Sequence, residues 1–184
     1  MISRNPSAGK ALRSSVVLVG LMGAGKSTIG RRLAETLNAP FTDADNEIAI
    51  AAGCSISDIF AIYGEPIFRD LEQRVMLRLL TGPPVVIATG GGAFMNPAIR
   101  QAVHEKAVSV WLKADLEVLL ERVSRKNTRP LLETGDKRAI LMRLMEERHP
   151  VYGEAEIVVD SGHGKHENVV SGILQALEER GFLG

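Results

Sequence analysis

Hydrophobic and polar positions follow two different patterns along the chain. Short runs of consecutive apolar, mostly β-branched residues are typical of strands buried on both faces. We predict such strands at residues 16–19, 40–42, 85–88, 108–112 and 157–159. Longer stretches repeat an apolar residue every three or four positions, which is typical of helices with one buried face. We predict helices at residues 26–37, 46–52, 57–63, 65–80, 116–123, 137–148 and 166–180.

Glycine, asparagine and proline mark where several of these helices begin or end. Gly53 and Gly64 follow the short helices at 46–52 and 57–63, and Asn96-Pro97 is a capping residue followed by a proline suited to a first helical position. Pro150 cannot donate a helical hydrogen bond, so we expect the helix at 137–148 to end just before it.

The alternation of strands and helices predicts an α/β fold, in which helices cover both faces of a five-stranded parallel sheet. Such three-layer sheets bind ligands beyond the carboxyl ends of their strands. The loop after Val19, the sequence TDADN at 42–46 and the glycines after Ala88 should therefore line one crevice. The length fits a single domain at residues 15–184. Residues 1–14 are polar, basic and acid-free, and we interpret them as a disordered tail rather than a transit peptide.

Composition narrows the classes of partner and the compartment. The formal net charge is zero, which argues against a general nucleic-acid binder. No apolar stretch approaches the roughly 18 residues of a membrane-spanning helix. Cys54 is the only cysteine, so no intrachain disulfide can form, and a reducing, cytoplasmic location is expected.

Residues 20–27 read GLMGAGKS, a complete G-x-x-x-x-G-K-S phosphate loop between a predicted strand and a predicted helix. The glycines allow a tight turn whose backbone N–H groups point at phosphate, beside the positive end of the helix dipole. Lys26 would meet the β- and γ-phosphates, and the Ser27 hydroxyl could bind Mg²⁺. The motif predicts a nucleotide-dependent kinase or NTPase.

The acidic pair Asp43 and Asp45 could hold the metal, take a proton, or cap the following helix. The strand at 85–88 carries no acid where many such proteins place a metal-associated aspartate, which favours the pair as its source. Residues i and i+2 of a strand share a face, so both acids could face the phosphates. The three glycines at 90–92 favour close passage of a substrate along the backbone.

Arginines lie in three segments that could meet anions. Arg69 is near the start of the long helix, and Arg129 lies in a polar segment at about 124–136 whose length is typical of a lid. Arg148 comes at the end of its predicted helix. A lid arginine could stabilise the transferring phosphoryl group, and two arginines could clamp one carboxylate.

Taken together, GLMGAGKST, FTDADNEI, SISDIFAIYGEPIFRDLE, ATGGGAF, NTRPLL and LMEERHPVY resemble the shikimate kinase family in order and spacing, over about residues 15–180. The resemblance implies a compact P-loop fold with a lid and a substrate-binding region at about 44–80. It also implies ATP-dependent phosphorylation of the 3-hydroxyl of shikimate, in aromatic amino acid biosynthesis, by a monomer that uses Mg²⁺.

The family pattern implies a role for each matching residue. The residues implied to bind ATP are Gly23, Ala24, Gly25, Lys26, Ser27, Thr28, Arg122 and Arg129. Those implied to bind shikimate are Asp45, Arg69, Gly90, Gly91, Gly92 and Arg148. The residues implied to act in catalysis are Lys26, Asp45 and Arg129, and those on the metal side are Ser27 and Asp43, the latter through water. The loop at 161–166 falls where the family contacts adenine.

Two other functions compete with this one. A gluconate- or nucleoside-type kinase would share the phosphate loop, but it has no need of two arginines beside a triple glycine. A non-catalytic, shikimate-sensing relative would be expected to lack Lys26, Asp45 or Arg129, and all three are present.

Overall fold

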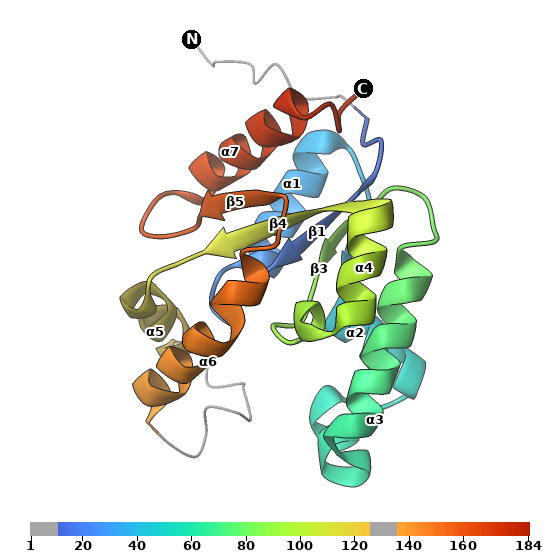
Figure 1. Cartoon of the computed structure of the whole chain (residues 1–184), viewed down its shortest axis with the longest axis vertical. Coiled ribbons are helices and arrows are strands. Elements are labelled where there is room, and N and C mark those ends of the chain that lie inside the picture. The colour runs from blue at the N-terminus through green and yellow to red at the C-terminus, as the bar shows by residue number, and fades with distance from the viewer. Residues whose placement is uncertain (1–10, 126–135) are drawn as a thin grey trace.

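The computed structural model describes residues 11–125 and 136–184, and a five-stranded parallel sheet runs through its centre (Figure 1). The strand order is β2-β3-β1-β4-β5. The strands are β1 Ser15–Val19, β2 Phe41–Asp43, β3 Val86–Ala88, β4 Ala107–Lys113 and β5 Ile157–Asp160. The predicted α/β fold is confirmed. β1 is central, and its buried apolar residues pack against helices on both faces, as a doubly covered sheet requires.

Helices form the outer two layers. They are α1 Lys26–Leu37, α2 Ala44–Ala52, α3 Ile56–Leu79, α4 Pro97–Lys106, α5 Leu116–Ser124, α6 Lys137–Tyr152 and α7 His166–Glu179, with a short 3₁₀ turn η1 at Ala93–Met95. Figure 1 shows α1 and α7 side by side behind the sheet, with α4 in front of it. The carboxyl ends of β1, β2 and β3 meet at one edge, where the phosphate loop, TDADN and the triple glycine lie.

A second, smaller core lies between α2 and α3. Its buried members are Ile48, Ile59, Phe68 and Val75, and they form a cluster distinct from the one around the sheet. Helices α2 and α3 therefore pack as a unit that projects from the domain, as Figure 1 shows. Exposed apolar residues also gather on this unit, among them Ile62, Tyr63 and Ile67.

Helix α6 does not end before Pro150, as the sequence analysis expected. It continues to Tyr152 with the proline in its last turn. One helical hydrogen bond is lost at the proline, but the turn is held because Tyr152 is fully buried and the N–H of Gly153 donates to the carbonyl of His149 at 2.9 Å. Arg148 consequently lies one turn before the end of the helix rather than at it.

The expectation of a disordered tail up to residue 14 is wrong for residues 11–13. The N–H of Ala11 donates to the carbonyl of Gly184, that of Gly184 donates back, and the N–H of Arg13 donates to Phe182. These antiparallel contacts pair the two ends of the described chain. Residues 1–10 of the expected tail lie outside the described residues.

Across residues 11–125 and 136–184, no single helix has the length and apolarity to cross a membrane. The pair formed by α2 and α3 meets the criterion only by length and composition, and its two helices are bent by 83°.

The break predicted at Gly64 is confirmed as a kink inside α3. Gly64 has φ 78° and ψ 173°, a conformation that is essentially reserved for glycine, whereas the residues on both sides are helical. The kink separates the first turns of α3 from the segment that carries Arg69.

We therefore expect Gly64→Ala to lower the free energy of unfolding by about 1–3 kcal/mol, because alanine is strained at this φ and ψ even though its Cβ would make only an ordinary contact, 3.7 Å from Cδ of Pro66. Chemical denaturation measures the change. The matched control is Gly172→Ala in α7, a helical glycine with no positive φ, where the same substitution should be neutral or slightly stabilising. An unchanged free energy of unfolding in Gly64→Ala would show that alanine is not strained at the kink.

Candidate active site

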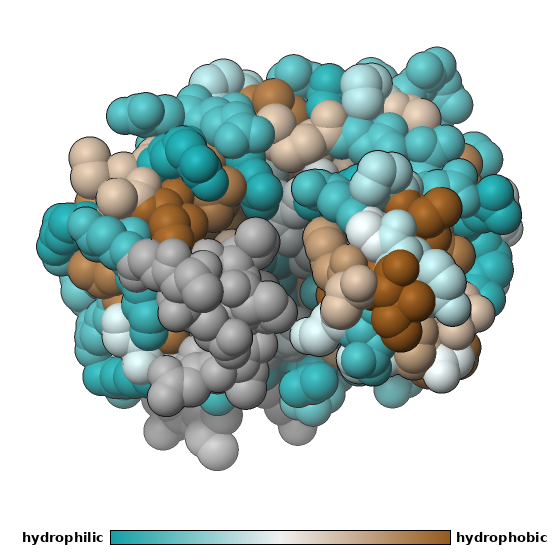
Figure 2. All heavy atoms as spheres, turned by 90° about the horizontal axis from the view of Figure 1, so that it is seen from below, coloured by the Kyte–Doolittle hydropathy of each residue, from teal (hydrophilic) through white to brown (hydrophobic). Residues whose placement is uncertain are grey.

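The carboxyl edge of the sheet opens into a pocket of about 500 Å³. Figure 2 views this end of the molecule and shows a hollow between a lobe that contains α3 and a lobe that contains α5 and α6. The lining residues come from segments far apart in sequence: Gly23, Gly25, Lys26, Ser27, Thr28, Asp43, Asp45, Asn46, Thr89, Gly90, Arg122, Val123, Arg125 and His166. The predicted crevice therefore brings the phosphate loop and the acidic pair together.

The phosphate loop packs tightly against the end of β4. At Gly20, which has φ 144°, a Cβ would lie 2.8 Å from the carbonyl oxygen of Leu112, so a side chain does not fit. Lys26 is buried, and its Nζ donates to the carbonyls of Gly20 at 2.7 Å and Leu21 at 2.9 Å. The lysine thus places a positive charge inside the loop, at the N-terminus of α1, where an anion is favoured.

The outer side of the loop is held by residues from the C-terminal half of the chain. The Ser161 hydroxyl donates to the carbonyl of Ala24 at 2.6 Å. Arg122 donates to the carbonyl of Gly23 at 3.2 Å and to that of Gly162 at 2.8 Å. Arg122 therefore lines the pocket and also ties the loop after β5 to the phosphate loop, and its predicted contact with ATP stays a prediction.

Asp43 links the acidic pair to the phosphate loop. Its Oδ2 accepts a hydrogen bond from the Ser27 hydroxyl at 2.7 Å, and its Oδ1 accepts one from the backbone N–H of Asp45 at 3.1 Å. Of the acidic pair, Asp43 is thus the N-cap of α2, whereas Asp45 lies inside the helix and does not cap it. The argument from strand alternation is also wrong, because β2 ends at Asp43 and Asp45 lies in the first turn of α2. The turn of the helix, not the pleat of a strand, brings both acids to the pocket.

Each of the three glycines faces a functional side chain. A Cβ on Gly90 would lie 2.8 Å from Oδ1 of Asp45, and one on Gly91 would lie 3.1 Å from Nη1 of Arg148. A Cβ on Gly92 would overlap the guanidinium group of Arg69, with Nη2 at 2.7 Å. The sequence analysis attributed the glycines to close passage of a substrate. The structure adds a second reason: the neighbouring side chains already occupy the space that a side chain at position 90, 91 or 92 would need.

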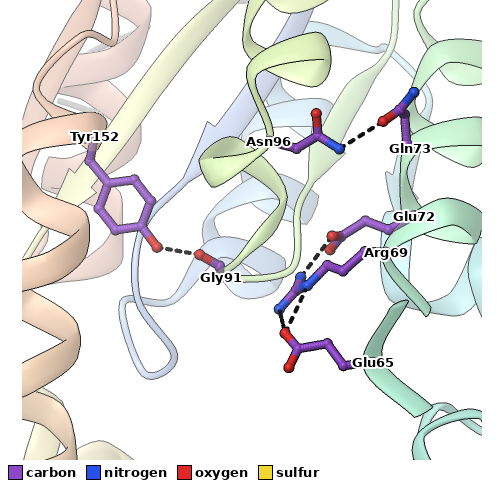
Figure 3. A network of polar contacts seen from close by, with 7 residues as sticks. All are labelled: Glu65, Arg69, Glu72, Gln73, Gly91, Asn96 and Tyr152. Carbon is purple, nitrogen blue, oxygen red and sulfur yellow. Dashed lines mark hydrogen bonds and ion pairs between the residues drawn. The ribbon is translucent and has the colours of Figure 1, made fainter. Parts of the chain in front are cut away.

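Arg69 is held by two acids of its own helix (Figure 3). Its Nη1 donates to Glu72 at 2.7 Å, and its Nε and Nη2 donate to Glu65 at 3.2 and 3.1 Å. Burial by itself would lower the pKa of Arg69, but the hydrogen bonds and charges of Glu72 and Glu65 outweigh it, so the pKa is raised. The guanidinium is therefore fixed as a cation beside the glycine loop.

Glu72 is a site residue that the sequence analysis missed. Burial raises the pKa of its carboxyl, the nearby Asp45 raises it further, and the ion pair with Arg69 opposes both effects. Among the described residues, its Oε1 has no hydrogen-bond partner, and this atom lies near the Gly90 backbone. The signal available in the sequence was the three-residue spacing from Arg69 within RDLE, which places the two side chains on one face of a helix.

Arg148 approaches the glycine loop from α6, opposite Arg69. Among the described residues its buried Nε has no hydrogen-bond partner. The two arginines that were predicted to form a clamp therefore reach adjacent glycines from two different lobes. Arg129 and most of the expected lid at 124–136 lie outside the described residues, so the predicted role of Arg129 stays a prediction.

Comparisons with known proteins agree with this geometry. A family model described as shikimate kinase matches residues 22–178. A shikimate kinase of Caulobacter vibrioides is 57% identical over 165 residues, which cover 90% of this chain and 82% of the relative.

Solved structures of shikimate kinases resemble this chain, and so does the structure of a gluconokinase, the competing function considered above. The shikimate kinase of Acinetobacter baumannii, solved in complex with shikimate, has a TM-score of 0.88 and 36% identity, and the match covers 95% of this chain and 98% of that one. A gluconokinase of Sinorhizobium meliloti has a TM-score of 0.64 at 19% identity over 93% of this chain and 95% of that one, which is a likeness of fold alone. With its phosphate loop, acidic pair and triple glycine at one sheet edge, the chain belongs to the shikimate kinase family.

Proposed function

We propose that this chain transfers the γ-phosphoryl group of ATP to the 3-hydroxyl of shikimate, giving shikimate 3-phosphate and ADP. As a member of its family the chain is a phosphotransferase. The observation that carries the choice of acceptor is the pair of arginines, Arg69 and Arg148, which reach the same glycine loop from two lobes. A clamp of this kind suits a compact acid whose carboxylate is bound at one end and whose hydroxyl reacts at the other. The Acinetobacter baumannii relative was solved with shikimate, which supports the same acceptor.

The phosphate loop would bind the triphosphate. Gly23, Gly25 and Lys26 line the pocket, and the side chain of Lys26 would turn from the loop carbonyls towards the β- and γ-phosphates. Thr28 and Arg122 also line the pocket and would contact the nucleotide. We assign Arg129, which lies in the expected lid, to the phosphoryl group that is transferred.

The donor atoms near the phosphate loop suit Mg²⁺. The Ser27 hydroxyl and the Asp43 carboxylate are 2.7 Å apart and are hard oxygen donors, and Mg²⁺ commonly takes one or two protein oxygens together with water and phosphate. Ser27 would bind the ion directly and Asp43 would hold it through water. The ion would supply charge neutralisation of the phosphates.

The acceptor would lie between Asp45 and the arginines. Asp45 would accept a hydrogen bond from the 3-hydroxyl, aim its oxygen at the γ-phosphorus and receive its proton as the new P–O bond forms and the bond to ADP breaks. Arg69 and Arg148 would hold the carboxylate, and Gly90, Gly91 and Gly92 would line the ring. Because little covalent chemistry is asked of the protein, positioning and charge stabilisation account for most of its effect.

Other expectations from the sequence extend this proposal. The unit of α2 and α3 would be the substrate-binding region, in agreement with its separate core. Residues 124–136 would form the lid of a single domain at 15–184. Action as a monomer in the cytoplasm remains a prediction.

The experiment that tests the proposal is ADP release with one acceptor at a time and with Mg²⁺ varied. Shikimate should support turnover that depends on Mg²⁺, whereas gluconate and nucleoside monophosphates should not. Turnover with gluconate would favour the gluconate-type kinase. Tight binding of shikimate without ADP release would favour a non-catalytic relative.

Asp45→Asn should lower kcat at least about 100-fold, because asparagine keeps the shape but cannot take the proton. Nucleotide affinity should survive, since Asp45 contacts the acceptor side. Steady-state kinetics and a separate nucleotide titration measure the two quantities. Unchanged turnover would remove Asp45 from its proposed role.

Arg69→Ala should raise the KM for shikimate by about 10- to 100-fold, the size of a lost hydrogen bond to a charged group. The KM for ATP should change little. An effect confined to ATP would contradict the carboxylate clamp. Arg74→Ala is the control, because Arg74 is on the same helix but is exposed and paired with Asp70.

Glu72→Gln should raise the KM for shikimate by about tenfold, because Arg69 loses the buried one of its two charged partners and keeps only the exposed Glu65. The pKa of Glu72 is raised, so in the parent protein the carboxylate becomes protonated as the pH falls to values still above those usual for a glutamate. The shikimate KM of the parent should therefore rise towards acid pH, and this limb of the profile should be absent in Glu72→Gln. Asp70→Asn, an exposed neighbour, should keep the parent profile. Identical profiles for Glu72→Gln and the parent would show that Glu72 does not control Arg69.

A further inference from the structure

Tyr152 joins α6 to the glycine loop through its hydroxyl. It is the last residue of α6, it is fully buried, and its ring packs at a centroid distance of 5.9 Å from Trp111. The hydroxyl donates to the carbonyl of Gly91, as Figure 3 shows. Packing explains the ring but not the hydroxyl, because a phenylalanine would fill the same space.

Gly91 lies where three parts of the active site meet. A Cβ at this position would lie 3.1 Å from Nη1 of Arg148, 3.6 Å from the carbonyl of Gly20 and 3.8 Å from the N–H nitrogen of Met22. The first contact belongs to α6 and the other two to the phosphate loop. A hydrogen bond that fixes the Gly91 carbonyl therefore helps to set the distance between Arg148 on α6 and the phosphate loop.

The same hydroxyl lies in the field of the Arg148 charge. Burial raises the pKa of Tyr152 to about 12, and the positive charge of Arg148 opposes the rise. The phenol has one proton, which it donates to the carbonyl of Gly91. The hydroxyl thus stays protonated at any ordinary pH and keeps this hydrogen bond.

The far end of the loop has its own attachment. The amide nitrogen of Asn96 donates to the side-chain oxygen of Gln73 in α3 at 2.8 Å. Arg100 donates to the carbonyls of Phe94 and Met95 at 2.9 Å. These bonds fix the segment after the glycines to α3 and α4, whereas Tyr152 fixes the glycines to α6.

We infer that Tyr152 is a positioning residue for the acceptor: its hydroxyl holds the Gly91 carbonyl, and with it the glycine loop, at the distance from the Arg148 guanidinium that binds the acceptor's carboxylate. The inference rests on the proposed assignment of Arg148 and the glycine loop to shikimate. Tyr152 itself need not contact the substrate.

Tyr152→Phe tests the inference, because it removes the hydroxyl and keeps the ring against Trp111. The KM for shikimate should rise about five- to tenfold, the size of one lost hydrogen bond, while the KM for ATP should stay within about twofold. The matched control is Tyr63→Phe, which removes the only other tyrosine hydroxyl from a side chain that is 58% exposed. The control should behave like the parent in both constants.

A second measurement separates positioning from stability. The rise in melting temperature caused by a fixed shikimate concentration should be smaller in Tyr152→Phe than in the parent and in Tyr63→Phe. Each variant is compared with its own ligand-free midpoint, so a general loss of stability does not mask the result.

Arg148→Lys distinguishes failure of the inference from failure of the assignment on which it rests. If Arg148→Lys raises the shikimate KM and Tyr152→Phe does not, the inference is wrong. An equal loss of shikimate and ATP binding in Tyr152→Phe would also overturn it, because this would indicate a structural role alone. If Arg148→Lys has no effect on shikimate, the proposed carboxylate clamp is wrong.

Discussion

The active site is organised around the hydrogen bonds that the buried ammonium group of Lys26 donates to the phosphate loop. A charge inside a protein needs hydrogen-bond partners, and here the carbonyls of Gly20 and Leu21 supply them. These carbonyls can face inward because Gly20 adopts a backbone conformation that brings the loop against β4 without a side chain between them. The loop is consequently shaped around its lysine before a nucleotide binds. Its neighbours, Asp43 and the glycine loop, take their positions from it.

The elements that we propose for the two substrates differ in construction. The phosphate loop belongs to the main sheet, where it is bound to strand ends and to Ser161 and Arg122. The residues that we propose for the acceptor instead come from two lobes, with Arg69 on the kinked α3 and Arg148 on α6. The triple glycine touches both lobes and the phosphate loop. Its lack of side chains is thus a requirement of the protein's own packing as well as of substrate access.

Much of this arrangement could be predicted from sequence because short motifs encode local backbone geometry. The glycines of the phosphate loop, the break at Gly64 and the cap at Asn96 each follow from the conformations that those residues allow. The order of strands and helices then placed the motifs at one edge of a sheet.

What could not be predicted depends on packing between distant segments. Glu72 and Tyr152 look like ordinary helix residues until α3 and α6 are placed on either side of the glycine loop. The proline that was expected to end α6 is tolerated because the burial of Tyr152 holds the last turn. Asp45 reached the pocket by a different route from the one expected, because the strand ended two residues before it. Local rules identified the chemical groups, and tertiary contacts decided which groups act together.

The bonds from Ser161 and Arg122 to the phosphate loop have a consequence for protein engineering. The family resemblance implies that the loop between β5 and α7 contacts adenine, which would make this loop a natural place to redesign base preference. Yet a replacement loop that omits the Ser161 hydroxyl, or that moves the Gly162 carbonyl away from Arg122, would also release two supports of the phosphate loop. A change made to alter selectivity for the base would therefore also alter the geometry of the phosphate loop. A successful redesign would keep residues 161–162 and vary the chain only after them.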